Sequence, residues 1–329
     1  MDITNVLRQK SEKVEDILRE YTKIGDKSIQ EMISHPISAG GKRIRPFLVF
    51  MGCEAVGGDP DSILPAAASV ELLHTFTLIH DDIMDHDTER RGKPTVHVLW
   101  GEELAIVVGD TMYSGAFKAL VDLRKMGFPE GIVLDCVQSL VEANSELQEG
   151  QILDMMFEER DIISEEEYMG MISKKTGSLI DASLRIGCIL GNGSQEELNA
   201  LSVYGRNIGI AFQVKDDLLD LMAEPSELGK PVGSDIRKGK KTLIIVHALN
   251  NADPSQKDEI NSVLGDNKAT DDQVRETIDL LTEIGSIQYA KDTIVRLMDE
   301  GVRSLKILKD SEAKQHLTSL SEYLIVRRK

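Results

Sequence analysis

Leu78-Ile79-His80-Asp81-Asp82-Ile83-Met84-Asp85 closes a long apolar segment that begins at Ile63. When this segment is wound as an α-helix, apolar residues cover nearly all of its sides, so we expect it to be buried in a helical bundle. Asp81 and Asp85 would then lie one turn apart on one face, where like charges repel each other. They also stand at the carboxyl end of the helix dipole, which disfavours anions. The pattern predicts a bound divalent cation, and carboxylate oxygens suit Mg²⁺.

A second aspartate cluster, Asp216-Asp217-Leu218-Leu219-Asp220, repeats this spacing near the end of a helix predicted over 195–223. One such cluster could be ordinary surface charge. Two clusters that each end an apolar helix are hard to explain in that way. If the two helices face each other, six carboxylates converge and could hold several Mg²⁺ ions around a polyanionic ligand, as phosphoryl chemistry requires.

Composition narrows the class of protein. The chain has 329 residues, and its 41% hydrophobic content with only 4% aromatic residues favours a core packed from aliphatic helices. The net charge of −18 argues against binding to nucleic acid, which depends on neutralising phosphates. Three widely spaced cysteines, Cys53, Cys136 and Cys188, predict reduced thiols in a cytoplasmic protein. We see neither a signal peptide nor an apolar run close to 18 residues, so no membrane span is expected.

Helical spacing of apolar residues recurs throughout, which predicts a single all-α domain over residues 1–329. Breaks are expected at His35-Pro36, in a loop over 90–94, at Thr176-Gly177-Ser178 and at Gly191–Ser194, and 224–240 is expected to be a loop. Ser194 is a predicted N-cap. The predicted helices are 2–22, 47–56, 63–85, 102–125, 195–223, 242–250, 255–265, 271–283, 287–309 and 312–327, with further helical segments between 129 and 195.

Basic residues gather at predicted helix ends and loops. Paired guanidinium groups suit bidentate recognition of phosphate oxygens. For any one basic residue, solvated surface charge is the simpler interpretation. Taken as a set, they predict a protein built for two anionic groups, one bridged through metal and one held directly. The set is Lys42-Arg43, Arg45, Arg90-Arg91, Lys174-Lys175, Lys230 and Lys240-Lys241.

In combination and in order, these motifs resemble those of the trans-isoprenyl diphosphate synthases, most closely the archaeal-type geranylgeranyl diphosphate synthases. The resemblance covers nearly the whole chain. It includes both aspartate clusters and several shorter motifs, each of which alone would mean little. The shorter motifs are Gly40–Pro46, Arg90-Arg91-Gly92, Gly150–Asp154, Lys175-Thr176-Gly177, Phe212-Gln213 and Gly229-Lys230 with Gly233-Ser234-Asp235.

The resemblance implies an all-α homodimer with a deep apolar cavity between the helices of each protomer. It implies that about three Mg²⁺ ions, or Mn²⁺ in their place, bind an allylic substrate such as dimethylallyl, geranyl or farnesyl diphosphate. Their ligands would be Asp81, Asp85 and Asp216, with Asp82, Asp217 and Asp220 completing the catalytic motifs. Arg90, Lys175 and Lys230 would contact the same diphosphate. Isopentenyl diphosphate would be held by Lys42, Arg45, His74 and Arg91, and secondary contributions would come from Thr176, Gln213, Asp154 and Lys240.

The reaction implied is ionisation, condensation and elimination, in which charge stabilisation by preorganised groups replaces a protein nucleophile. Product length is expected to depend on Phe76, about 7.5 Å down the helix from Asp81, and on the adjacent Thr77. Through the resemblance, this pair and the absence of an insertion between Asp82 and Asp85 imply a C20 product, with C15 and longer chains as alternatives. Phe76 could also be an ordinary core residue, and His74 a core histidine. A class I terpene cyclase and a non-catalytic partner subunit are the rival functions. The basic motifs argue against the cyclase and the complete aspartates against the subunit.

Overall fold

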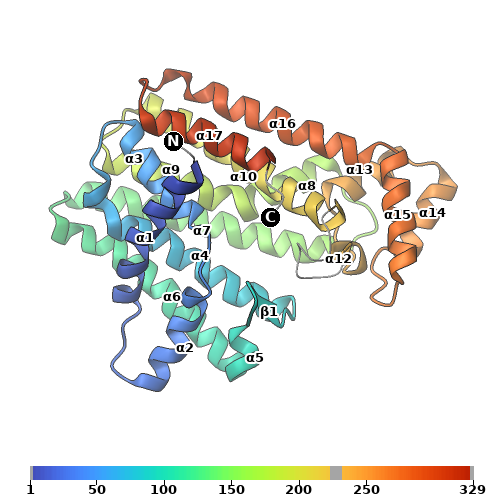
Figure 1. The fold of residues 1–329 in the computed structure, drawn as a ribbon, viewed down its shortest axis with the longest axis horizontal. Helices are drawn as coiled ribbons and strands as arrows, with labels where there is room; N and C mark the ends of the chain where they lie inside the picture. The colour runs from blue at the N-terminus through green and yellow to red at the C-terminus, as the bar shows by residue number, and fades with distance from the viewer. Residues whose placement is uncertain (1–2, 223–231, 327–329) are drawn as a thin grey trace. The chain divides into compact units, whose positions relative to one another are not determined.

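The fold is all helical, as predicted. It is seen in a computed structural model that describes residues 3–222 and 232–326, and Figure 1 shows the ribbon. Among these residues the regular strands are limited to a small antiparallel hairpin, β1 (Glu89–Arg90) with β2 (Lys93–Pro94), in which Arg90 pairs with Lys93. The hairpin falls where a simple loop was expected. The all-α class is confirmed.

The helices are α1 (Ile3–Tyr21), α2 (Lys27–Ser38), α3 (Ile44–Ala55), α4 (Leu64–Met84), α5 (Val96–Trp100), α6 (Glu102–Asp122), α7 (Glu130–Glu158), α8 (Glu165–Ile172), α9 (Ser178–Leu190), α10 (Gln195–Met222), α12 (Ser234–Arg237), α13 (Leu243–Asn251), α14 (Pro254–Val263), α15 (Asp271–Glu283), α16 (Ser286–Ser304) and α17 (Glu312–Val326). Short 3-10 turns cover Pro60–Ile63, Leu123–Met126 and Leu305–Ile307, and a π-helical turn covers Ser173–Gly177.

The contacts divide the chain into two compact units, which we describe separately. The first unit consists of Met1–Asn144, Leu179–Ser202 and Leu305–Ser319. The second consists of Ser145–Ser178, Val203–Ser304 and Leu320–Lys329. Helices α7 and α10 contribute residues to both units. The first aspartate cluster therefore belongs to the first unit and the second cluster to the second unit.

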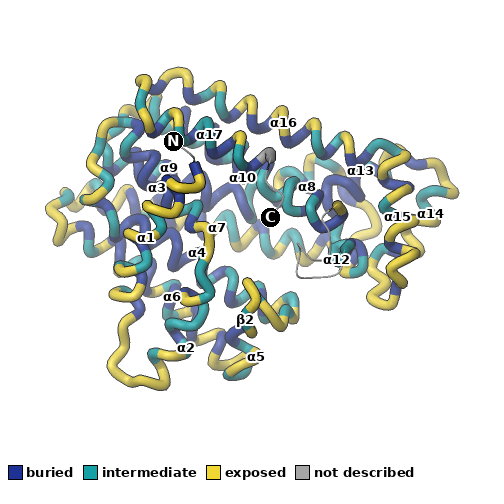
Figure 2. Tube along the Cα trace, in the orientation of Figure 1, coloured by how far each residue is buried: buried dark blue, intermediate teal, exposed yellow. Residues whose placement is uncertain are grey.

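Helix α4 is the centre of the first unit, where it packs against α6, α3 and α1. Figure 2 shows α4 as buried along most of its length. Three consecutive alanines, Ala66–Ala68, and the side chains of Leu72 and Leu73 are fully buried. Each buried leucine stabilises the fold by about 1.5–3 kcal/mol. The prediction that the segment ending in the first aspartate cluster is a core helix is confirmed.

The second unit is built around α13, which packs against α16, α8, α14 and α15. Helix α8 begins with a capping box, because the Ser164 side chain accepts a hydrogen bond from the Glu167 amide while the Glu167 carboxylate accepts one from the Ser164 amide. One turn further along, Tyr168 is almost completely buried. This helix start therefore fixes where Tyr168 enters the core, a position that matters for the second aspartate cluster.

Two helical segments, Pro60–Met84 and Glu102–Met126, are long and apolar enough to cross a membrane by length and composition alone. The same test is passed by core helices of globular proteins. In the first segment 72% of the most apolar window is buried within the protein. That burial, and the charged cluster at its end, fit a core helix.

Four further details of the sequence-based prediction were wrong. Helix α2 continues through Pro36 to Ser38 instead of breaking there, because a proline so close to the helix end removes only one backbone hydrogen bond. The turn expected at Thr176–Ser178 is a π-helical turn that joins α8 to α9. An unpredicted break separates α7 from α8. Within the predicted 224–240 loop, α12 forms a helical turn, while residues 224–231 lie outside the described residues.

Candidate active site

The first aspartate cluster lies at the carboxyl end of α4, where the three carboxylates differ in exposure. Asp81 is in the last turn of the helix and Asp85 is its C-cap, and both are half-buried. The amide of Asp85 donates to the carbonyl of Asp81 over 2.8 Å, which confirms that the two residues are one turn apart. Asp82, between them, is buried. The outer two carboxylates are thus the accessible pair.

Asp82 is held by Arg90 from the β1–β2 hairpin. The Arg90 Nε donates to Asp82 Oδ1 over 2.5 Å, and its Nη2 lies 3.7 Å from Asp87. Burial raises the pKa of Asp82 to about 6, although the adjacent guanidinium opposes this rise. Arg90 was predicted to contact diphosphate directly. In this structure its guanidinium ties the hairpin to the aspartate cluster.

The residues predicted to hold isopentenyl diphosphate all belong to the first unit. Lys42 precedes α3, Arg45 lies in its first turn, His74 is in α4 and Arg91 is at the tip of the hairpin. The pKa of His74 is lowered well below its usual value by burial and then by Arg45, Arg91, Arg90 and Arg43. A neutral imidazole among guanidinium groups marks a locally positive environment. Such an environment favours a bound anion and is not typical of an ordinary apolar core.

In the second aspartate cluster, on α10, the carboxylates again differ. Asp216 is half-buried, whereas Asp217 and Asp220 are buried. Asp217 accepts hydrogen bonds from the Tyr168 hydroxyl at 2.5 Å and from Gln213 Nε2 at 3.0 Å. Burial, reinforced by the nearby Asp235, raises the pKa of Asp217 to about 7. The middle aspartate of each cluster therefore has a positioning contact, as Asp82 has with Arg90.

Asp220 anchors the chain segment that follows α10. Its two carboxylate oxygens accept from the Ser234 hydroxyl at 2.7 Å and from the Asp235 amide at 3.0 Å. Asp220 therefore fixes the start of α12, and with it the segment that carries Lys240. Lys230 lies outside the described residues.

Lys175 sits in the π-helical turn between α8 and α9, and such turns often occur at functional sites. Its Nζ bonds to Asp154 Oδ2 of α7 over 2.5 Å. Next to it, the Thr176 hydroxyl donates to Gln213 Oε1 over 2.9 Å. A methyl group added at Gly150 would lie 2.3 Å from the backbone nitrogen of Lys175, which explains the glycine in this motif. The second unit brings together the predicted site residues Lys175, Thr176, Gln213, Asp154 and Lys240. Four of them, Lys175, Gln213, Asp154 and Lys240, line one cavity of about 70 Å³.

Phe76, the predicted determinant of product length, lies in a cluster of rings between α4 and α6. Its ring centroid is 4.6 Å from that of His80 and 5.1 Å from that of Tyr113, which in turn is 4.9 Å from Phe117. Thr77 is buried, and its hydroxyl donates to the carbonyl of His74. The sequence identified Phe76 but missed its α6 partners, Tyr113 and Phe117.

The accessible carboxylates fit a hard divalent cation. Mg²⁺ typically takes one or two protein carboxylates and completes its shell with water and substrate phosphate. Asp81 with Asp85 provides such a pair, and Asp216 provides a third carboxylate in the second unit. In the part of the chain that the structure describes, no group of three or more His, Cys, Asp or Glu side chains is arranged to hold a metal. The predicted convergence of Asp81, Asp85 and Asp216 stays a prediction.

Two further residues of the site were not singled out from the sequence. Tyr168 is one, and its only signal was a lone aromatic residue in an acidic helix start. Glu71 is the other, a buried acid in the middle of the apolar segment that forms α4. An isolated glutamate in an otherwise apolar core helix is a signal for a buried partner of opposite charge.

Comparisons with known proteins identify the family of the chain. The family model for polyprenyl synthetase matches residues 26–281. The chain is 44% identical to a short chain isoprenyl diphosphate synthase of Methanothermobacter thermautotrophicus, with 95% of this chain and 98% of that protein covered. It is 45% identical to a geranylgeranyl diphosphate synthase of Methanosarcina mazei, with 88% and 87% covered. A crystal structure of geranylgeranyl pyrophosphate synthetase from Pyrococcus horikoshii matches with a TM-score of 0.93 at 42% identity, covering 99% and 98%.

The fold and these similarities define a prenyltransferase of the all-α type. The chain belongs to the polyprenyl synthetase family. The resemblance predicted from its motifs is thereby confirmed. Members of this family depend on a divalent metal ion.

Proposed function

We propose that this protein condenses isopentenyl diphosphate with allylic diphosphates and makes geranylgeranyl diphosphate as its main product. The observation that carries the proposal is the repeated aspartate geometry. In both clusters the first aspartate is half-buried, while the middle one is buried and hydrogen-bonded. Accessible carboxylates at two helix ends are what a metal-bound diphosphate needs.

Asp81, Asp85 and Asp216 are the proposed metal ligands. When bound there, Mg²⁺ would neutralise the diphosphate leaving group of the allylic substrate and so favour ionisation. Asp82 and Asp217 keep the helix ends in place through Arg90, Tyr168 and Gln213. A count of about three ions, and Mn²⁺ as a substitute, are part of the same proposal.

Isopentenyl diphosphate is the proposed occupant of the basic group formed by Lys42, Arg45, His74 and Arg91. Guanidinium groups bind phosphate oxygens in pairs, and a neutral imidazole can still donate one hydrogen bond. On the allylic side, Arg90, Lys175 and Lys230 are the proposed contacts of the leaving diphosphate. Secondary contributions to the allylic diphosphate site are proposed for Thr176, Gln213 and Lys240.

The C20 product is proposed from the ring cluster around Phe76. A growing prenyl chain that runs along α4 would meet Phe76 about one and a half turns below Asp81. Tyr113 and Phe117 extend the same barrier on α6. C15 and longer products are the alternatives.

We further propose that residues 1–329 work as one catalytic domain in a cytoplasmic homodimer. All three cysteines are buried and unpaired with each other, as expected for a reducing compartment. Large apolar side chains are exposed on α5, α6 and the first half of α7, which suits contact with a second copy. These residues are Val98, Leu99, Leu104, Ile106, Val107, Leu134 and Val141. No role for nucleic acid or a membrane span is proposed.

The purified chain, incubated alone with labelled isopentenyl diphosphate and dimethylallyl diphosphate, tests this function. We expect label in prenyl diphosphates only when a divalent metal is present. A terpene cyclase would leave the label unincorporated and would release hydrocarbons only in a second incubation that contains geranylgeranyl diphosphate. A non-catalytic partner subunit would give no product until another chain is added.

A further inference from the structure

Arg43 was grouped by sequence with the phosphate-binding basic residues, but the structure buries it. Its side chain is 1% exposed, and its Nη1 donates to Glu71 Oε1 over 2.6 Å. Its Nε and Nη2 lie 2.8 and 2.7 Å from Glu15 Oε1. Nη2 also donates to the carbonyl of Ile37 over 3.0 Å. The buried guanidinium of Arg43 thus links α1, α2 and α4.

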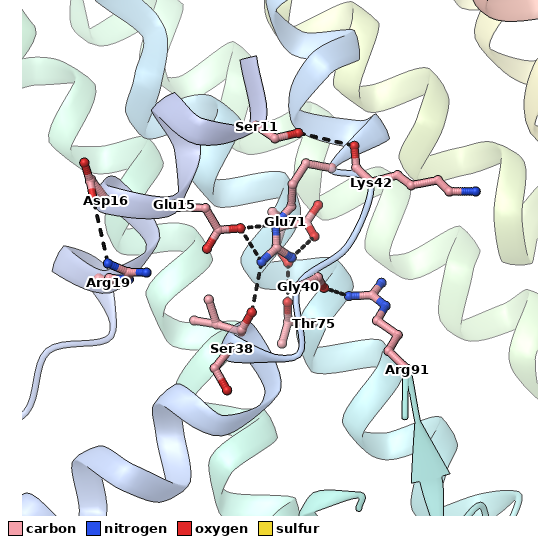
Figure 3. A network of polar contacts seen from close by, with 12 residues as sticks. Ser11, Glu15, Asp16, Arg19, Ser38, Gly40, Lys42, Glu71, Thr75 and Arg91 are labelled. Carbon is pink, nitrogen blue, oxygen red and sulfur yellow. Dashed lines mark hydrogen bonds and ion pairs between the residues drawn. The ribbon is translucent and has the colours of Figure 1, made fainter. Parts of the chain in front are cut away.

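The backbone of Arg43 has the left-handed conformation, with φ 49° and ψ 41°. This conformation is unfavourable for a residue with a side chain and persists only where surrounding contacts enforce it. The contacts to Glu71, Glu15 and Ile37 provide that enforcement. At this turn two neighbouring side chains point in different directions. Lys42 is exposed, while Arg43 points inward. Figure 3 shows the Lys42 side chain extending away from Glu15 and Glu71.

The same loop receives Arg91 from the hairpin. The Arg91 Nη1 donates to the carbonyl of Gly40, and Figure 3 shows this contact beside the Arg43 network. A methyl group added at Gly41 would lie 2.6 Å from Arg91 Nη1, so the guanidinium is seated closely on the loop. The Lys93 ammonium group also bonds to the carbonyl of Ser38 over 2.8 Å. The loop between α2 and α3 therefore sets the position of Arg91 as well as that of Lys42.

We propose that Arg43 and Glu71 are positioning residues whose buried ion pair holds the turn that places Lys42 and Arg91 for isopentenyl diphosphate. This inference rests on the proposed function of that basic group. Neither residue touches the substrate. Removing one partner leaves a buried charge that destabilises the fold, whereas replacing both with apolar residues of similar volume often restores stability. An apolar pair would fill the same space but make none of the Arg43 contacts that hold the turn.

Comparing the single and double variants therefore separates an effect on the position of the loop from an effect on the stability of the fold. Arg43→Met is expected to raise the KM for isopentenyl diphosphate at least about tenfold, with the KM for dimethylallyl diphosphate within about twofold of wild type. Arg43→Met/Glu71→Met should recover the melting temperature of the wild type and keep the raised KM. Arg43→Lys should rescue only in part, because one ammonium group cannot reproduce the fork of contacts.

The matched control is Lys10→Met/Glu54→Met, which removes another ion pair between α1 and its neighbour in the same unit. It should leave both KM values unchanged. Calorimetric titration of isopentenyl diphosphate without divalent metal should show the same weakening in the Arg43 variants. An isopentenyl KM of wild-type size in the double variant would overturn the inference, and so would an equal rise in both KM values. If the wild type itself neither binds nor incorporates isopentenyl diphosphate, the proposed function fails instead.

Discussion

Within each aspartate cluster, the individual carboxylates differ in burial and in hydrogen-bond partners. Asp81 and Asp216 are half-buried, whereas Asp82 and Asp217 are buried against Arg90 and Tyr168. Asp220 is buried and anchors α12 through Ser234. The sequence treats all of these carboxylates alike, because burial and hydrogen-bond partners depend on distant parts of the chain.

Asp81→Ala and Asp216→Ala are each expected to reduce turnover at least about 100-fold, the usual loss when one electrostatic group facing the transition state is removed. Helical content and melting temperature should stay close to those of the wild type, since both carboxylates are partly exposed. Steady-state assays and circular dichroism check both points. Asp135→Ala, an exposed position on α7, is the control. Near-normal turnover in a folded Asp81→Ala protein would contradict the proposed role.

His74 gives a pH-dependent prediction. Its lowered pKa means that the folded protein keeps this imidazole neutral, while the unfolded chain takes up a proton near pH ~6.5. The unfolded state therefore binds more protons below that pH, and acid costs stability at up to about 1.4 kcal/mol per pH unit. His74→Asn should flatten this slope between about pH 5 and 7 in denaturant titrations. The exposed His86→Asn is the control, and equal slopes for wild type and His74→Asn would refute the prediction.

At the scale of elements, α7 and the π-helical turn at Ser173–Gly177 depend on close approach. Gly150→Ala should destabilise the fold by about 1–3 kcal/mol, since its methyl group would overlap the backbone of Lys175. Displacing Lys175 should also lower activity. Gly131→Ala, in the same helix with nothing nearby, should be neutral or stabilising by up to about 1 kcal/mol. Chemical denaturation measures both, and similar stabilities for the two variants would contradict the expected clash.

Helices α4 and α6 meet at the rings of Phe76, Tyr113 and Phe117. Phe76→Ala should lengthen the main product, and Phe76→Ala/Tyr113→Ala should lengthen it further, because each removes a ring from the proposed barrier. Chromatography of dephosphorylated products measures the chain length. Phe128→Ala, which lies outside the ring cluster, should leave the products unchanged. An unchanged product ladder in Phe76→Ala would place the barrier elsewhere.

Sequence periodicity predicted most of these elements well, because helices such as α4, α10 and α15 carry long apolar patterns with clear ends. It failed at Pro36 and at the π-helical turn, where the chain stays helical despite residues that usually break a helix. The roles of Arg43 and Glu71 were also hidden. A basic motif beside a loop predicts phosphate binding, and only the fold shows that one of its arginines turns inward.

The whole molecule has to meet two chemical demands in the proposed reaction, metal-assisted ionisation of one diphosphate and direct binding of the other. Neither aspartate cluster nor basic group meets both demands alone. The family relationship supplies the activity class. The proposed site assigns a separate set of residues to each demand. An assay of the complete reaction therefore tests both sets of residues together.

The most direct measurement is one incubation of the purified wild type with dimethylallyl diphosphate, labelled isopentenyl diphosphate and Mg²⁺, followed by chromatography of the dephosphorylated products. We predict that geranylgeraniol carries most of the label and that a chelator abolishes its formation. Absence of labelled prenyl alcohols, or their formation at an undiminished rate with all divalent metal removed, would contradict the account.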